Sequence, residues 1–321
     1  MTGSPELGVV LGAPRSGTTW LQRLLASSPK VASPQETHLF DIYLRVQWRR
    51  WAKQEADLVR ALDGIGDGGQ PEDRVIGLPT ILDKEDLLDS QRVLVERVVS
   101  RALATKPGAS IVIEKTPSNS LCVDMIDRLC PTARFLHIIR DPRDVMASLR
   151  DISASWAGGW APRSAVGAAK LWLCHVEGAR RAAILGPERY LEIRYEDLRR
   201  DTAAVLTTIV DYLGLPDDAA SLVAAQTEGD GASFSEVFAF RPDISARLSV
   251  APGREPAGFR GNGRRPLSPI ALQAADTILG ATARDAGYTS GWSRRSVLGH
   301  RVLTATALVQ HALHHAARIR R

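Results

Sequence analysis

Residues 7–26 read LGVVLGAPRSGTTWLQRLLA, and this stretch decides the fold. The apolar run at 7–11 predicts a buried strand, and the spacing of apolar residues over 18–26 predicts a helix. Gly12 and Gly17 mark the turn between them. A strand that passes through a glycine-containing turn into a helix is the local signature of an α/β protein that binds an anion at the helix N-terminus.

The turn carries the groups that such an anion needs. The first N–H groups of a helix have no intrahelical acceptor, and hydroxyl groups at Ser16, Thr18 and Thr19 add further donors. Arg15 supplies a positive charge. We therefore expect this loop to hold a phosphate or a similar anion.

The loop differs from that of a nucleoside triphosphatase. The glycine spacing matches GxxxxGK[ST], but Thr18 occupies the lysine position and the basic residue is Arg15. Kinases also need an acid near a strand end to hold magnesium. The predicted strand ends offer Glu114, Arg140 and Arg194, which are poorly suited to magnesium because two of the three are cationic. A P-loop kinase or nucleotide phosphotransferase is thus the alternative rather than the leading interpretation.

Strand and helix patterns alternate along the rest of the chain. Alternation of this kind predicts an α/β fold, a three-layer sandwich with a central parallel sheet. We expect one domain over 1–293, because the sequence shows neither internal repeats nor a second boundary. The further predicted strands are 110–113, 134–139 and 189–193. The further predicted helices are 40–62, 84–103, 118–129, 144–152, 165–185 and 202–213.

Composition restricts the function classes. The chain has 321 residues and a formal net charge of +5, but residues 294–321 hold six arginines and no acid, so the body is not basic. A nucleic-acid binder is therefore not expected. Three cysteines lack zinc-site spacing and favour a reducing cytoplasm, and no secretory signal or apolar run of about 18 residues is seen. The high Ala, Arg and Gly content is typical of a high-GC bacterium.

Residues 14–21, PRSGTTWL, resemble the 5′-phosphosulfate loop of the sulfotransferases that use 3′-phosphoadenosine 5′-phosphosulfate (PAPS). This sequence matches the form of the family loop that has Arg, here Arg15, rather than Lys before Ser-Gly-Thr. The resemblance implies the P-loop-like sulfotransferase fold. It also implies that the donor's 5′ side is bound by Arg15, Ser16, Gly17, Thr18, Thr19 and Trp20.

A second motif, FLHIIRDPRDVMAS at 135–148, resembles the family's 3′-phosphate motif. The resemblance implies that Arg140, at a strand end, and Ser148, eight residues later on the next helix, hold the 3′-phosphate. The segment RYEDL that contains Tyr195 is similar to the family's strand-end motif, whose tyrosine lies near the adenine.

The long segment 228–266 is the expected late nucleotide loop. Its end, FRGNGRRP at 259–266, loosely resembles the family segment that closes over the 3′-phosphate. The resemblance implies nucleotide contacts by Arg260, Gly261, Gly263 and Arg264. Whether Arg260, Arg264 or Arg265 reaches the phosphate stays open.

The acceptor side resembles the Golgi and heparan-sulfate-type glycan sulfotransferases. Residues 34–41, PQETHLFD, are similar to their KExHFFD segment, with Gln35 in place of the lysine. The resemblance implies that Glu36 is the base, and His38 is the fallback base on the same face of an extended segment. Residues 114–117, EKTP, resemble a strand-end element whose lysine, here Lys115, faces the sulfuryl group or the acceptor.

Together these motifs imply a PAPS-dependent sulfotransferase (EC 2.8.2.-). Its product would be adenosine 3′,5′-bisphosphate (PAP), its base a carboxylate, and it would need no metal. In-line transfer builds charge on the bridging oxygen, which Arg15 and the loop amides would stabilise. The acceptor is a hydroxyl group of a small molecule, a glycolipid or a glycan. A non-catalytic PAP-binding protein is a further alternative.

The tail 294–321 has apolar residues at helical spacing and predicts a basic amphipathic C-terminal helix. Packing against the parent domain is one interpretation. The other is that the helix makes a peripheral contact with an anionic membrane surface or with a partner subunit.

Overall fold

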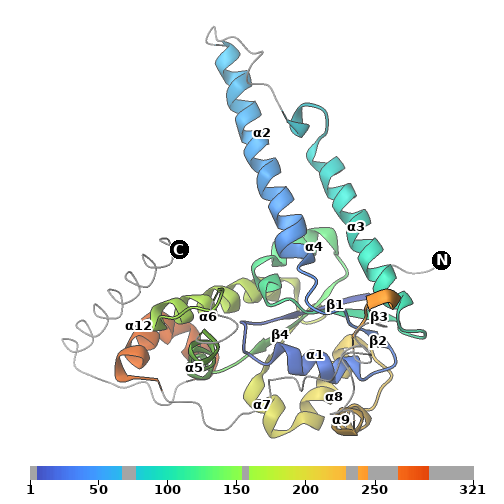
Figure 1. The fold of residues 1–321 in the computed structure, drawn as a ribbon, viewed down its shortest axis with the longest axis vertical. Coiled ribbons are helices and arrows are strands. Elements are labelled where there is room, and N and C mark those ends of the chain that lie inside the picture. The colour runs from blue at the N-terminus through green and yellow to red at the C-terminus, as the bar shows by residue number, and fades with distance from the viewer. Residues whose placement is uncertain (1–5, 67–76, 154–158, 229–237, 245–266, 289–321) are drawn as a thin grey trace.

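The computed structural model describes residues 6–66, 77–153, 159–228, 238–244 and 267–288. Its centre is a five-stranded sheet in the order β2-β3-β1-β4-β5, in which every neighbouring pair is parallel (Figure 1). The strands are β1 (Glu6–Leu11), β2 (Val31–Ala32), β3 (Ile111–Glu114), β4 (Arg134–Ile139) and β5 (Tyr190–Arg194).

Four of these strands are the predicted ones, with ends shifted by at most one residue. The sequence reasoning missed β2, because two residues are too short to show a period. Tertiary pairing creates this strand: Val31 and Ala32 lie in register with Ile111 and Val112 of β3.

The predicted three-layer arrangement is confirmed. Successive residues of a strand point to opposite faces, and in β1 Val9 and Leu11 face one core cluster whereas Val10 faces another. The cluster around Val9 and Leu11 includes residues of α3 (Lys84–Ala104), α4 (Val123–Leu129) and α6 (Ala165–Arg180). The cluster around Val10 includes residues of α1 (Thr18–Ala26), α7 (Tyr195–Arg200), α8 (Thr202–Leu213) and α9 (Ala219–Glu228).

A third apolar cluster lies beside the carboxyl end of β4. It joins Ile139 to α5 (Pro142–Ser153), to α6 and to α12 (Pro269–Asp285). Figure 1 shows α12 and α5 next to α6 at one side of the sheet. The sequence reasoning did not predict α7, α9 or α12.

Three predicted helices are not continuous α-helices. The one at 40–62 begins as a π-helix, η1 (Leu39–Leu44), and continues as α2 (Arg45–Gly66). The one at 118–129 divides into a 3-10 helix, η3 (Pro117–Leu121), and α4. The one at 165–185 ends as the 3-10 helix η4 (Arg181–Leu185). Apolar spacing does not reveal these forms, because each is a segment of only five or six residues beside or within a longer helical pattern.

The helices α2 and α3 project from the body, with η2 (Leu78–Thr80) between them (Figure 1). In the part of the chain that the structure describes, no helix combines the length and the apolar character needed to cross a bilayer. The predicted C-terminal helix lies outside the described residues. The same is true of the late nucleotide loop except for 238–244 and its first residue, Glu228.

The sheet topology gathers the sequence motifs at one edge. Because all five strands are parallel, their carboxyl ends share that edge. Gly12 follows β1, Lys115 follows β3, Arg140 follows β4 and Tyr195 follows β5. The predicted site residues therefore converge although they lie far apart in the sequence.

Candidate functional site

The loop after β1 places the residues predicted to bind an anion at the start of α1. Helix α1 begins at Thr18, with Gly17 as its N-cap at a φ of 97°. Arg15 also has a left-handed backbone, with a φ of 75°. The Ser16 hydroxyl is buried and has no hydrogen-bond partner among the described residues. An unpaired buried hydroxyl beside a helix N-terminus fits a bound anion.

Close packing explains the two glycines of this loop. A Cβ atom at Gly12 would lie 2.7 Å from the carbonyl oxygen of Ile138. A Cβ atom at Gly17 would lie 2.4 Å from Cδ2 of Tyr195. The ring of Tyr195 therefore rests directly against the start of α1.

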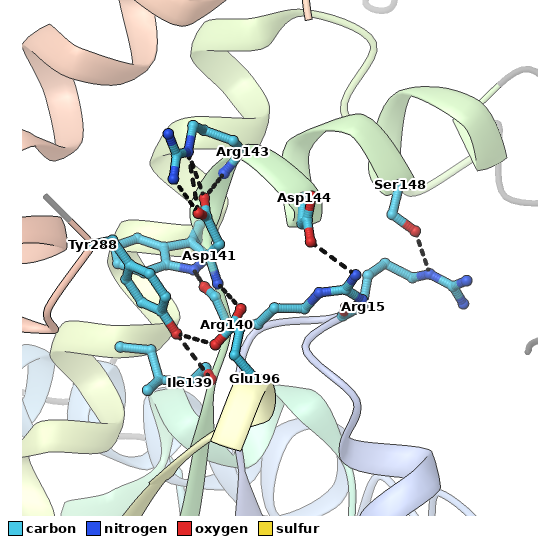
Figure 2. A network of polar contacts seen from close by, with 10 residues as sticks. Arg15, Ile139, Arg140, Asp141, Arg143, Asp144, Ser148, Glu196 and Tyr288 are labelled. Atoms are coloured by element: carbon cyan, nitrogen blue, oxygen red, sulfur yellow. Dashed lines mark hydrogen bonds and ion pairs between the residues drawn. The ribbon is translucent and has the colours of Figure 1, made fainter. Parts of the chain in front are cut away.

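The structure brings together the residues predicted for the two ends of the nucleotide. The Arg15 Nε–H group donates to the Ser148 hydroxyl oxygen at 3.0 Å. An Nη1–H group of Arg140 donates to the carbonyl oxygen of Arg15 at 3.2 Å. Figure 2 shows both guanidinium groups beside α5, with Arg15 reaching Ser148 and Arg140 reaching Asp144. Two cations that converge in this way create a strongly anion-attracting position.

Contacts on several sides hold Arg140 in place. Its guanidinium lies 4.2 Å from the centroid of the Tyr195 ring, and its Nη2–H group donates to Asp144 at 3.2 Å. The indole N–H group of Trp172 donates to the carbonyl oxygen of Arg140 at 2.9 Å. Within the part of the chain that the structure describes, the buried Nε atom of Arg140 has no hydrogen-bond partner. Trp20, at the end of the loop predicted to bind the 5′ side, meets Tyr195, the residue predicted to lie near the adenine, edge to face at 5.8 Å.

A second polar network supports the turn after β4. Glu196 accepts hydrogen bonds from the Asp141 backbone N–H group at 2.9 Å and from the Tyr288 hydroxyl at 2.8 Å. Burial, together with the Glu196 charge, raises the pKa of Tyr288, so the phenol stays a donor. Arg143 pairs with Asp141 (Figure 2). Sequence reasoning missed Tyr288 and Trp172, since neither lies in a motif.

On the acceptor side, Lys115 and Glu36 form a close ion pair. The distance from Lys115 Nζ to Glu36 Oε1 is 2.5 Å. The lysine side chain is 1% exposed and the glutamate side chain 39% exposed. Lys115 also donates to the Thr19 hydroxyl at 3.3 Å. One buried ammonium group thus links the anion loop to the predicted base.

Side-chain hydrogen bonds also anchor the segment that carries Glu36. The Gln22 amide of α1 donates to the Ser33 hydroxyl and to the Pro34 carbonyl oxygen, each at 2.8 Å. The Ser33 hydroxyl donates to the Ile113 carbonyl oxygen of β3 at 2.7 Å. The Ala239 N–H group donates to the Ser33 carbonyl oxygen at 2.7 Å. The predicted base therefore stands on a segment tied to α1 and to the sheet.

The geometry expected for His38 is wrong. His38 was expected to lie within an extended segment and to share a face with Glu36, but its backbone is left-handed, with a φ of 53°. Its ring contacts Asp41, with Nδ1 3.0 Å from Oδ2. His38 is the N-cap of η1, and this turn directs the chain into the helix. The fallback base is thus paired with a carboxylate of its own helix.

Glu114, the last residue of β3, is a buried acid that the motif comparison left without a role. Its carboxylate accepts hydrogen bonds from the hydroxyls of Thr37 at 2.8 Å and Thr116 at 2.7 Å, and from the Asn119 amide. Burial raises the pKa of Glu114, and the hydrogen bonds from Thr116 and Thr37 oppose that rise. The same hydroxyls lie next to Glu36 and Lys115 in the sequence.

Other predicted site residues cannot be placed. The segment that contains Arg260, Gly261, Gly263 and Arg264 lies outside the described residues. Among the residues that are described, no group of three or more His, Cys, Asp and Glu side chains has an arrangement suited to a metal ion.

The chain resembles known proteins at three levels. The model of the Sulfotransferase family matches residues 9–219. The nodulation protein NoeE of Sinorhizobium fredii is 29% identical over 149 residues, which are 46% of this chain and 31% of NoeE. The match thus spans less than a third of that relative's length.

Solved structures of sulfotransferases are also similar. The sulfotransferase domain of the olefin synthase of Synechococcus PCC 7002 has a TM-score of 0.47 at 20% identity, covering 85% of this chain and 94% of that one. The mouse sulfotransferase SULT7A1 in complex with PAP has a TM-score of 0.48 at 14% identity, covering 95% and 89%.

Proposed function

Because the chain belongs to the sulfotransferase family, we propose that it transfers the sulfuryl group of PAPS to a hydroxyl group of an acceptor. The observation that carries this proposal is the position of Lys115. Its ammonium group contacts both Thr19 of the anion loop and Glu36. A donor site and a candidate base are thereby joined at one point.

The residues present fit the adenine nucleotide of this donor. The Ser16 hydroxyl and the Arg140 Nε atom are buried and have no partner in the described ranges, and both could donate to phosphate oxygens. We propose that Arg15, Ser16, Gly17, Thr18 and Thr19 hold the 5′-phosphosulfate and that Arg140 and Ser148 hold the 3′-phosphate. Trp20 and Tyr195 would contact the adenine. Arg260, Gly261, Gly263 and Arg264 would complete the nucleotide site from the late loop.

Bound PAPS would supply an activated sulfuryl group whose bond to the bridging oxygen breaks as the acceptor attacks. Arg15 and the backbone N–H groups at the start of α1 would stabilise the charge left on that oxygen. Glu36 would take the proton of the acceptor hydroxyl. Lys115 contacts both Thr19 and Glu36 and would orient these two side chains.

Binding and turnover assays test this proposal. We expect the purified chain to bind PAP more tightly than AMP, and to transfer label from [³⁵S]PAPS to hydroxyl-bearing small molecules, glycolipids or glycans in extracts. PAP binding without transfer would support the non-catalytic alternative. Magnesium-dependent release of ADP from ATP, without PAP binding, would support the kinase alternative and overturn the proposal.

We further propose that the enzyme is bacterial and cytoplasmic, from its Ala, Arg and Gly content and its three cysteines. We also propose that segment 294–321 makes a peripheral contact with an anionic membrane or with a partner subunit, because it carries six arginines and no acid. Co-sedimentation with phosphatidylglycerol vesicles tests the membrane contact. We compare the full chain with a chain that ends at Trp292, at low and high salt. Equal sedimentation of the two chains would refute the membrane contact.

A further inference from the structure

Glu114 connects the two segments of the chain that carry the candidate base, Glu36, and the buried lysine, Lys115. The side chain is 3% exposed, and one oxygen, Oε1, accepts from both the Thr37 and the Thr116 hydroxyl. Thr37 directly follows Glu36, and Thr116 directly follows Lys115. A single carboxylate oxygen therefore holds together two segments that are 77 residues apart in the sequence.

The two threonine hydroxyls that donate to Glu114 also accept hydrogen bonds from backbone N–H groups. The Leu39 N–H group donates to the Thr37 hydroxyl oxygen at 3.1 Å. The His38 N–H group donates to the Thr116 hydroxyl oxygen at 3.3 Å. Each hydroxyl has one hydrogen, and it is donated to Glu114. The network thus runs from the backbone of η1, through two threonines, to one buried acceptor.

We propose that Glu114 is a positioning residue of the reaction centre, which fixes Glu36 against Lys115 through Thr37 and Thr116. The inference rests on the proposed function for the roles of Glu36 and Lys115. Glu114 itself touches neither of their side chains in the hydrogen bonds given above, so its effect is on geometry. Hydrogen bonds to a buried carboxylate are strong because the surroundings screen them poorly.

Accurate positioning matters for this chemistry. A displacement of about 1 Å in a catalytic group can lower the rate by about 100-fold. Without the two hydroxyl contacts, the backbone at Thr37 would be held to β3 less firmly. The structure then predicts a loss of turnover that leaves nucleotide binding intact, because Thr37 and Thr116 lie outside the anion loop.

Paired substitutions at the threonines separate hydrogen bonding from shape. Thr37→Val and Thr116→Val keep the shape and remove the hydroxyl, whereas Thr37→Ser and Thr116→Ser keep the hydroxyl. Thr202→Val is the matched control, because it removes a hydroxyl that donates to the Leu198 carbonyl oxygen in a different helix.

Three measurements are made on the full chain of each variant. Amide hydrogen exchange monitors His38 and Leu39, titration gives the Kd for PAP, and PAP release from PAPS gives kcat and KM. We expect both valine variants to exchange at least about tenfold faster at these amides and to lose at least about tenfold in kcat, with the Kd for PAP and the KM for PAPS within about twofold. We expect the serine variants and Thr202→Val to remain within about threefold of the unchanged chain in kcat.

The opposite pattern overturns the inference. Valine variants that keep the wild-type exchange and kcat, or serine variants as impaired as the valine variants, would show that the hydroxyls do not position the centre. If the unchanged chain neither binds PAP nor releases it from PAPS, the proposed function fails. The exchange rates at His38 and Leu39 would still decide whether the hydrogen-bond network holds this segment.

Discussion

Two arginines from distant parts of the sequence meet at the start of α1. Arg140 donates to the carbonyl oxygen of Arg15, 125 residues earlier in the chain. Like charges repel when they are brought together, and an anion between them reverses this cost. The proposed function assigns Arg15 to the 5′-phosphosulfate and Arg140 to the 3′-phosphate, so we expect their individual substitution to affect ligands differently.

Arg140→Ala should weaken PAP binding and leave AMP binding nearly unchanged. A lost charge-assisted hydrogen bond costs about 2 kcal/mol, which corresponds to a roughly 30-fold rise in the Kd for PAP. Calorimetric titration of both nucleotides measures this difference. Arg181→Ala is the control, because Arg181 pairs with Asp124 on the surface. Equal losses for PAP and AMP would contradict a 3′-phosphate role for Arg140.

Glu36→Gln should abolish most turnover without changing nucleotide affinity. The amide has the same shape and cannot accept the proton, so the expected loss in kcat is roughly 10²- to 10⁴-fold. The comparison variant is His38→Ala, whose ring contacts Asp41 in the structure. Near-normal turnover in Glu36→Gln together with a large loss in His38→Ala would assign the base to His38 instead.

At the scale of elements, the turn before α1 depends on the tyrosine that begins α7. The N-cap Gly17 and the Tyr195 ring touch so closely that a methyl group at Gly17 would overlap the ring. The ring is itself stacked on Arg140. The Tyr195 ring therefore links the start of α1, the start of α7 and the end of β4 by direct contacts.

Gly17→Ala should destabilise the protein and also weaken PAP binding. The left-handed backbone alone costs about 1–2 kcal/mol with a Cβ atom, and displacement of Tyr195 adds to it. Gly214→Ala separates the two effects, because Gly214 is also left-handed, with a φ of 68°, and its Cβ atom would meet no atom closer than 3.7 Å. Denaturant unfolding and PAP titration are compared. Equal losses of PAP affinity in both variants would refute the contact with Tyr195 as the cause.

At the scale of the whole molecule, two buried histidines couple folding to pH. Burial lowers the pKa of His137, in β4, although its contact with Glu192 acts in the opposite direction. Burial likewise lowers the pKa of His175, in α6. Both side chains therefore resist protonation in the folded state, whereas in the unfolded chain they protonate at about pH 6.5.

The free energy of unfolding should therefore fall as the pH drops below about 6.5, because the unfolded state then binds more protons than the folded state. Denaturant unfolding at pH 7.5 and 5.5 measures this loss. Glu114 contributes with the opposite sign, since its pKa is raised by burial. Glu114 is present in the unchanged chain and in the His137→Gln and His175→Gln variants alike, so its contribution cancels when the three are compared. Each variant should lose less stability on acidification than the unchanged chain. Equal losses in all three would contradict the prediction.

The amino-acid sequence by itself determined the elements whose signals are local. The apolar run at 7–11, the glycines of the loop and the helix 18–26 appear where they were predicted. Such features depend on residues within one or two turns of each other, through steric limits, helix capping and apolar periodicity. The motif at 135–148 also placed Arg140 and Ser148 on one strand end and the following helix.

Only the tertiary structure decided which of these residues touch. The contact of Arg15 with Ser148 spans 133 residues, and that of Lys115 with Glu36 spans 79. The two-residue strand β2, the left-handed turn at His38 and the Glu114 network likewise arise from pairing with β3 and from packing of the following helix. The physical reason is that strand order and register set these distances, and both are fixed by burial of the whole core rather than by neighbours along the chain.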